Sequence, residues 1–261
     1  MSRLAPLPRI MLAPTGARRS PADHPALPVT IPEIVSDARK AFEAGAEALH
    51  AHVRDTDGGH VLDAGLYREL IAEMARAVPD MPVQITTETV GRYTPEAQRS
   101  LVEAVEPEGV SVALREMCPG LEPDREARRF YSETAEAGIA LQHILYTPEE
   151  AARLAELVEA FVLPASGQML FVLGSYEPPR LALPSDLDGF LAAARPLANG
   201  FEWAACAFGH HERSCLLRAL GEGGCARIGF ENNTERPDGT PARDNAEQVA
   251  GLMQALAVDK A

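Results

Sequence analysis

The sequence has few of the features that mark secreted or membrane-spanning proteins. It holds four cysteines in 261 residues, at positions 118, 206, 215 and 225, with no C-x-x-C spacing. This pattern predicts reduced thiols rather than a disulfide framework. No apolar secretory signal opens the chain, and no apolar run reaches the roughly 18 residues that a membrane span needs. We therefore expect a cytoplasmic protein without a membrane partner.

Positive charge is also scarce. Lysine and arginine number 24 against 38 acidic residues, so the net charge is −14. Basic residues form no cluster larger than a pair, such as Arg18-Arg19. A chain with this balance lacks the basic surface that binds nucleic acid or anionic lipid, and we expect neither as a partner.

Short apolar runs alternate with stretches of helical periodicity. We expect strands at 9–14, 48–54, 83–88, 109–114, 139–145, 169–174, 201–208 and 225–231. Helix starts are indicated at Thr30, Thr94-Pro95, Thr147-Pro148 and Pro184-Ser185, and the last helix at 244–257. Eight strand–helix units in about 250 residues predict an α/β fold, one (β/α)₈ TIM-barrel domain over residues 1–261. A doubly wound open sheet would need a Gly-rich turn after the first strand, which T-G-A-R-R (15–19) is not.

The stretch ALHAHVR (48–54) carries His50 and His52 one residue apart. In an extended strand both side chains point to the same face, and two imidazoles buried there need a partner. Barrel closure would set the last strand, which ends near Glu231, about two interstrand spacings, roughly 10 Å, from the second strand. Two imidazoles and one carboxylate suit catalytic zinc, although non-haem iron takes the same trio. We expect His143, His210 and His211 to be core or rim residues instead.

Six stretches together resemble the β-keto acid cleavage enzymes, the family of the 3-keto-5-aminohexanoate cleavage enzyme. They are TGA (15–17), HPALPVTIPEI (24–34), AGAEALHAHVRD (44–55), FVLG (171–174), GFENN (229–233) and DNAEQVA (244–250). The resemblance implies a zinc-dependent barrel with one Zn²⁺ per chain, usually a homo-oligomer such as a dimer or tetramer. Its implied reaction joins a β-keto acid to acetyl-CoA and releases acetoacetate and a new acyl-CoA by a retro-Claisen step.

The resemblance also implies roles for individual residues. His50, His52 and Glu231 match the family's zinc ligands, and Arg227 matches its catalytic arginine. The zinc would chelate the keto acid through its carboxylate and ketone and acidify the carbon between them.

Three departures from the family pattern concern the base. Asn232 stands where the family has an aspartate that polarises the arginine, and arginine by itself is a very poor base. On the third strand Thr86 replaces a serine and Glu88 replaces a glycine. Glu88 is expected to point toward the metal as a fourth ligand, a replacement base, or an ion-pair partner of an arginine.

Other departures concern the substrates. Arg18 follows TGA, where amine-cleaving relatives have a glutamate, and a guanidinium there favours a second carboxylate on the substrate. The alternative is that Arg18 turns outward or pairs with an acidic residue. We also expect Thr15, Gly16 and Glu116 to contact substrate. The segment LGSYEPPR (173–180) lacks the family's paired glycines, which weakens the assignment of acetyl-CoA.

Two other functions remain open. One is a metal-dependent TIM-barrel hydrolase, although such hydrolases usually place the H-x-H pair on the first strand and end on aspartate. The other is a diverged barrel that holds metal and binds a small acid without turnover, as Asn232 and the missing glycines suggest.

Overall fold

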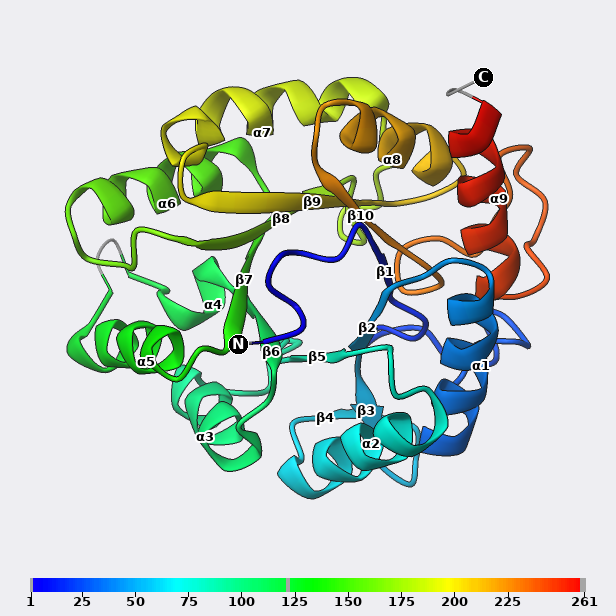
Figure 1. Cartoon of the computed structure of the whole chain (residues 1–261), viewed down its shortest axis with the longest axis horizontal. Coiled ribbons are helices and arrows are strands. Elements are labelled where there is room, and N and C mark those ends of the chain that lie inside the picture. The colour runs from blue at the N-terminus through cyan, green and yellow to red at the C-terminus, as the bar shows by residue number, and fades with distance from the viewer. Residues whose placement is uncertain (1, 121–122, 259–261) are drawn as a thin grey trace.

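In the computed structural model, which describes residues 2–120 and 123–258, eight parallel strands close into a barrel. Their order around the barrel is β1-β10-β9-β8-β7-β6-β5-β2, and the helices form a ring outside them (Figure 1). The predicted (β/α)₈ fold is confirmed. The barrel strands are β1 (Ile10–Leu12), β2 (Ala48–Ala51), β5 (Val83–Thr86), β6 (Gly109–Ala113), β7 (Ala140–Leu145), β8 (Gly167–Leu173), β9 (Phe201–Ala207) and β10 (Cys225–Ile228).

The helices begin where the sequence signals predict. Threonine side chains at positions 30, 94 and 147 accept hydrogen bonds from the first turns of α1, α3 and α6, each with proline at the start. Pro184 opens a short 3₁₀ turn (Pro184–Asp186) that leads into α7. The helices are α1 (Ile31–Glu43), α2 (Ala64–Ala77), α3 (Pro95–Val105), α4 (Leu114–Met117), α5 (Arg125–Glu136), α6 (Pro148–Glu159), α7 (Leu187–Ala194), α8 (Glu212–Gly221) and α9 (Asn245–Val258).

Barrel closure brings the first and last barrel strands together. Strand β1 pairs with β10 on one side and β2 on the other, with Met11 opposite both Arg227 and Ala48. The last strand therefore lies one strand away from β2, as the sequence predicts.

Several strands are shorter than predicted, and two of these differences concern the site. The run 48–54 divides into β2 and a two-residue strand β3 (Val53–Arg54), which pairs antiparallel with β4 (His60–Val61) in a hairpin that the sequence analysis missed. His52 lies between the two strands rather than within one. Strand β10 ends at Ile228 because Gly229 has a φ of 142°, so Glu231 lies in the following turn.

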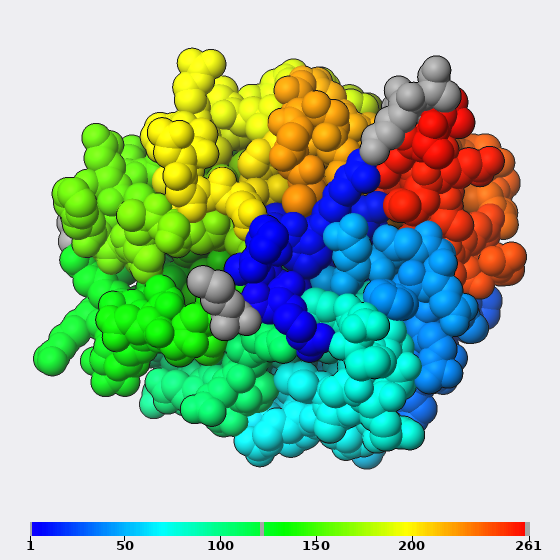
Figure 2. All heavy atoms as spheres, in the orientation of Figure 1, coloured from blue at the N-terminus to red at the C-terminus, as the bar shows by residue number. Residues whose placement is uncertain are grey.

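Residues 2–8 cross the amino-terminal end of the barrel. Figure 2 shows this dark-blue segment over the middle of that face. Leu4 is fully buried, and its carbonyl accepts a hydrogen bond from Gln168 Nε2 at 2.6 Å. The segment covers this end, so an approach for substrate must lie at the other end, where the loops after the strands gather.

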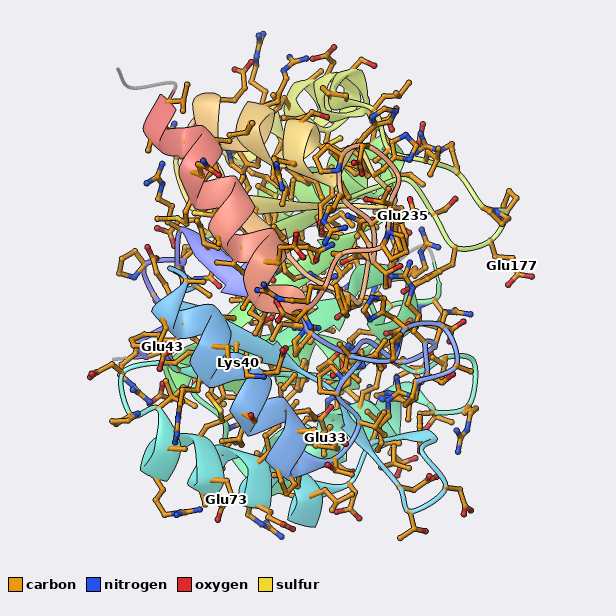
Figure 3. The ribbon with its side chains drawn as sticks, turned by 90° about the vertical axis from the view of Figure 1, so that its right-hand side faces the viewer. Glu33, Lys40, Glu43, Glu73, Glu177 and Glu235 are labelled. Atoms are coloured by element: carbon orange, nitrogen blue, oxygen red, sulfur yellow. The ribbon has the colours of Figure 1, made fainter. Side chains whose placement is uncertain are left out.

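Charged side chains cover the outer helices, including Glu33, Lys40 and Glu43 on α1 and Glu73 on α2 (Figure 3). Glu177 lies on the loop after β8, at the edge of the molecule toward which the strands run (Figure 3). No helix in the described ranges is both long and apolar enough to cross a membrane.

Candidate active site

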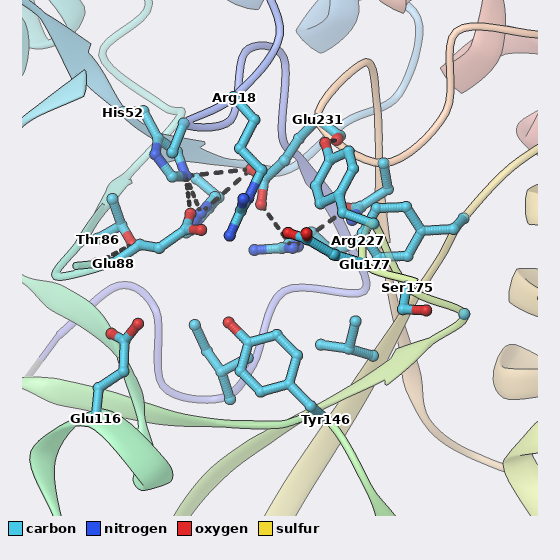
Figure 4. A pocket seen from close by; sticks show the side chains of 18 of the residues that line it. Arg18, His52, Thr86, Glu88, Glu116, Tyr146, Ser175, Glu177, Arg227 and Glu231 are labelled. Carbon is cyan, nitrogen blue, oxygen red and sulfur yellow. Dashed lines mark hydrogen bonds and ion pairs between the residues drawn. The ribbon is translucent and has the colours of Figure 1, made fainter. Parts of the chain in front are cut away.

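A cavity of about 330 Å³ opens at the carboxyl ends of the strands (Figure 4). Most of the residues predicted to do chemistry line it, although they come from five separate segments of the chain. These are Arg18, His50, His52, Thr86, Glu88, Glu116, Arg227, Glu231 and Asn232. Thr15 and Gly16 do not line this cavity.

His50, His52 and Glu231 converge at one side of the cavity. Glu231 Oε2 lies 3.5 Å from His50 Nε2 and 3.4 Å from His52 Nε2, and the two nitrogens are 3.2 Å apart. One ligand atom from each residue falls within 4.8 Å of the others, and all three residues are buried. The split of the predicted strand does not separate the pair, because the backbone stays extended enough for both rings to face inward.

The donor set fits a metal ion. Gln84 donates its amide NH₂ to Gln142, so its Oε1 accepts from His50 Nδ1 at 2.8 Å. This leaves a lone pair on His50 Nε2 directed at the cluster. Glu231 Oε2 is buried and accepts no hydrogen bond from the described residues. A cation between these atoms would satisfy all three.

The charge states suit the same role. Burial, helped by the nearby Arg227, lowers the pKa of His50 to about 3, so its imidazole is neutral. Burial would raise the pKa of Glu231, but Arg227 and the two histidines together hold it well below its usual range. A neutral imidazole and an ionised carboxylate are the forms that bind a divalent cation.

Two glycines place Glu231. A Cβ on Gly16 would lie 2.6 Å from Glu231 Cγ, and Gly16 itself has a φ of +67°. A Cβ on Gly229 would lie 2.4 Å from the carbonyl oxygen of Ala13. The glycine of TGA therefore acts by letting the first loop pack directly on the carboxylate side chain. Its neighbour Thr15 is buried and donates to the Pro28 carbonyl.

Arg227 is held by its neighbours. Its Nη2 lies 2.9 Å from Glu231 Oε1 and 3.2 Å from Asn232 Oδ1. Asn232 thus orients the guanidinium through its amide oxygen, in the place where the family pattern has a carboxylate, but without supplying charge.

Glu88 lies beside His52 of the possible metal-binding trio, and no arginine in the described part of the chain forms an ion pair with it. Its Oε2 lies 3.9 Å from His52 Nε2. Arg54 instead donates to the carbonyls of Gly16, Arg19 and Gly58. Burial raises the pKa of the Glu88 carboxyl. Of the three roles predicted for Glu88, the ion pair with an arginine is not formed.

Thr86 and Glu116 extend the wall away from the cluster. The Thr86 hydroxyl accepts a hydrogen bond from the Glu88 N–H at 3.1 Å and thereby helps to aim that side chain. Glu116, on α4, accepts from the Thr89 hydroxyl at 2.8 Å and from Gln98 Nε2 at 3.1 Å. Burial raises the pKa of the Glu116 carboxyl. Figure 4 shows Glu116 on the side of the cavity remote from Glu231.

Arg18 reaches into the cavity rather than outward (Figure 4). Its guanidinium lies 5.6 Å from the centre of the Tyr176 ring. It forms no hydrogen bond or ion pair with the described residues, Asp23, Glu88 and Glu116 included. The cation is therefore available to a ligand.

Sequence reasoning missed several residues of the site. Tyr146 and Tyr176 line the cavity, and His60 packs 5.0 Å from the His52 ring. Gln84 orients His50 from the neighbouring strand. The alternation of β5 could have indicated Gln84, because it shares the inward face with Thr86; the tyrosines follow strands without a distinguishing motif.

A family model described as beta-keto acid cleavage enzyme matches residues 9–258. The chain belongs to this family. The resemblance seen in the sequence is confirmed, and the protein is an enzyme of the β-keto acid cleavage class.

Similar proteins extend over almost the whole chain. The 3-keto-5-aminohexanoate cleavage enzyme of Acetoanaerobium sticklandii is 26% identical over 94% of this chain and 90% of its own length. That of Fusobacterium nucleatum is 23% identical over 94% of this chain and 89% of its own. The 3-oxoadipate:acetyl-CoA acetyltransferase of Cupriavidus necator is 26% identical over 94% of this chain and 88% of its own.

Solved structures share the barrel. A ternary complex of ObcA with a C4-CoA adduct and oxalate superposes with a TM-score of 0.68 at 14% identity, over 90% of this chain. The matched part spans 65% of the ObcA chain. A type I 3-dehydroquinate dehydratase from Clostridium difficile gives a TM-score of 0.60 at 12% identity, over 97% of this chain and 93% of that one. At these identities the likeness concerns the fold.

Proposed function

We propose that this enzyme cleaves an acidic β-keto acid with acetyl-CoA and releases acetoacetate and a new acyl-CoA. The observation that carries the proposal is the convergence of His50, His52 and Glu231 on one point at the wall of the cavity. The CH₂ carbon next to the substrate carboxylate loses a proton and bonds to the acetyl carbonyl carbon, and the acetyl C–S bond breaks to release CoA thiolate. The thiolate then adds to the keto carbon, whose bond to the former CH₂ carbon breaks. That carbon takes a proton back, which gives acetoacetate and the new acyl-CoA. No oxidant or reductant is needed.

The three ligands suit Zn²⁺, which accepts two imidazoles and a carboxylate with an open position. When bound, the cation supplies Lewis acidity that stabilises the enolate charge. The protein's own contribution is to keep the His50 imidazole neutral, to keep Glu231 ionised beside Arg227, and to orient His50 through Gln84. Metal analysis of the purified protein tests the identity of the ion.

Glu88 is the base in this proposal. Its carboxylate faces the cluster, and no described residue donates a hydrogen bond to it, whereas Arg227 is bonded to two oxygens and ordinary arginine is always protonated. A carboxylate 3.9 Å from His52 Nε2 lies where the acidic CH₂ of a chelated keto acid would be presented. Asn232 then serves to orient Arg227.

Arg18 is the reason to expect a second carboxylate on the substrate. It is a cation in the cavity that lies over the Tyr176 ring but has no hydrogen-bond or ion-pair partner among the described residues, and a guanidinium pairs with a carboxylate in a two-point fork. The relative from Cupriavidus necator is named for 3-oxoadipate, a keto dicarboxylate, at 26% identity. Glu116, on the side of the cavity remote from Glu231, would then face either an uncharged part of the substrate or water.

The deciding experiment offers the zinc-loaded protein a β-keto dicarboxylate, an amino β-keto acid and an aliphatic β-keto acid, each with and without acetyl-CoA. Acetoacetate and the new acyl-CoA are measured by mass spectrometry. We expect both products only with acetyl-CoA, and fastest with the dicarboxylate. Consumption of substrate without acetyl-CoA would favour a hydrolase. Metal binding without any turnover would favour a non-catalytic binder.

A homo-oligomer and a cytoplasmic location stay predictions. The four cysteines are free thiols, which accords with a reducing compartment. Light scattering of the purified protein would give the number of subunits.

A further inference from the structure

Arg18 and Arg19 are neighbours that the structure uses differently. Arg19 Nη1 donates to the carbonyl of Phe230 at 2.7 Å, and its Nη2 donates to the carbonyl of Asn232 at 3.2 Å. These two carbonyls stand on either side of Glu231 in the chain. The Arg19 guanidinium therefore holds the turn that carries Glu231, the proposed carboxylate ligand. Arg18 forms no hydrogen bond or ion pair within the described ranges.

The carbonyl between those two is held as well. The Tyr176 hydroxyl donates to the main-chain carbonyl of Glu231. The Tyr176 ring packs against Phe208 with centroids 4.4 Å apart, and the Arg19 guanidinium lies 5.7 Å from its centre. Three consecutive carbonyls of the turn are thus bound by two side chains from distant loops, so little freedom is left to the backbone of Glu231.

The loop that carries Arg19 is tied in turn to the histidines. Arg54, two residues after His52, donates from Nη2 to the carbonyls of Gly16 at 2.6 Å and Arg19 at 2.9 Å. Gly16 packs on the Glu231 side chain. A continuous set of contacts therefore runs from the segment with His52, through the first loop, to the turn with Glu231.

We propose that Arg19 and Arg54 form a brace that fixes Glu231 relative to the two histidines and thereby sets metal affinity. The inference rests on the proposed metal site. Both are positioning residues, because the hydrogen bonds of their guanidinium groups go to main-chain carbonyls. Holding a ligand in its bound position before the ion arrives removes an ordering cost from binding. Outer contacts of this kind typically contribute 10- to 100-fold to metal affinity.

Loss of the Arg19 charge and loss of its hydrogen bonds should change the affinity for Zn²⁺ in opposite directions, so the sign of the change decides between them. Removal of a positive charge near a cation site strengthens cation binding if electrostatics alone acts. Loss of the brace instead weakens cation binding. The variant Arg19→Gln removes one charge and the paired hydrogen bonds. The matched control Arg18→Gln removes one charge at a similar distance from the Tyr176 ring and no hydrogen bond to the described residues.

The affinity for Zn²⁺ is measured by competition between the metal-free full-length protein and a chromophoric chelator, with Co²⁺ absorption as a second readout of ligand geometry. We expect Arg19→Gln to bind Zn²⁺ about 10- to 100-fold more weakly and to change the Co²⁺ spectrum. Arg18→Gln should bind as tightly as wild type or slightly tighter. Arg54→Gln should match Arg19→Gln, and the double variant should add little, because the two residues act as one unit.

Two gentler variants keep the test decisive if Arg19→Gln does not fold. Arg19→Lys retains one donor, and Tyr176→Phe removes only the hydroxyl bound to the Glu231 carbonyl; each should cost affinity, but less than Arg19→Gln. Equal affinity in all folded variants, or tighter binding by Arg19→Gln, overturns the brace. A wild-type protein with no Zn²⁺ affinity instead overturns the proposed metal site itself.

Discussion

At the amino end of the barrel, polar groups hold the chain in place: Gln168 binds the Leu4 carbonyl at 2.6 Å, and Glu202 accepts the Leu7 N–H at 2.7 Å. At the carboxyl end, Glu88 and Glu231 line the cavity, and no residue in the described part of the chain donates a hydrogen bond to Oε2 of Glu231. One end uses its polar groups for stability, and the other leaves carboxylate oxygens available to a ligand. Changes at the first end should lower stability, and changes at the second should lower activity.

The largest effect is expected at the metal ligands. Replacement of His50, His52 or Glu231 by alanine removes one of three ligands, so bound metal should be lost. Because a Lewis acid contributes several kcal/mol to such a reaction, activity should fall about 10³-fold or more. Elemental analysis and acetoacetate release check this. Full metal content in each variant would show that the ion binds elsewhere.

Glu88 tests whether the carboxyl end holds more chemistry than the three ligands. Glu88→Gln should reduce proton exchange at the substrate CH₂ by about 10²- to 10⁴-fold, the usual contribution of a general base, with metal content unchanged. The measurement is loss of deuterium by nuclear magnetic resonance. If Asn232→Asp raises activity while Glu88→Gln changes nothing, the arginine scheme of the family applies instead.

Leu4 tests the other end. It is fully buried, and a Cβ on Gly109 would lie 2.5 Å from its Cδ1, so the fit is close. Leu4→Ala should lower the free energy of unfolding by about 2–5 kcal/mol through the cavity that it leaves. Urea unfolding gives this value, and activity per folded molecule should match wild type. A loss of kcat without a loss of stability would contradict the division between the two ends.

Arg18 tests the substrate side of the cavity. Arg18→Glu should lower kcat/KM for a β-keto dicarboxylate by more than about tenfold, through a lost charge-assisted contact and a new repulsion. The same change should leave an aliphatic β-keto acid little affected. An unchanged preference, or a wild-type preference for an amino β-keto acid, would exclude the proposed substrate class.

The last and smallest effect is expected at Asp37, a buried carboxyl outside the cavity whose raised pKa makes stability depend on pH. Burial, against an opposing hydrogen bond from Asn245, raises its pKa from 3.8 to about 7. Between these values the native state retains a proton that the unfolded state releases, so the contribution of Asp37 to stability is largest below pH 4 and is lost as the pH rises through 7.

Asp37→Asn should flatten that decline by about 1–3 kcal/mol, measured by urea unfolding at pH 4.5 and 7.5. Glu33 is a control of opposite sign, because hydrogen bonds from the Thr30 and Val29 N–H groups lower its pKa. An unchanged slope in Asp37→Asn would show that other groups set the pH dependence.

The alternation of apolar runs and helix starts was enough to predict the barrel, because the barrel strands are mostly buried and α1, α2, α3, α5 and α6 each begin at a residue whose side chain caps the first turn. The bounds of the strands at the site were not predictable in the same way. Strand β10 ends early because Gly229 adopts a φ of 142°, and β3 and β4 have two residues each, too few for a pattern.

The proposed metal ligands were predicted from the H-x-H pair and the family resemblance, and the structure brings their side chains together. The residues that position them were not, because their partners are main-chain carbonyls. Arg19 and Phe230 are 211 positions apart, and a carbonyl carries no side-chain signature in the sequence. Tyr176 was missed for the same reason.

Closure of the barrel through β1, β10 and β2 also governs when the site can form during synthesis. His50 and His52 leave the ribosome early, but Glu231 follows about 180 residues later, and its turn is held by contacts to the first loop. A nascent chain can therefore offer a cation only two imidazoles until nearly the whole sequence has emerged. Loading with metal would then follow completion of the fold, and a truncated chain would not retain the ion.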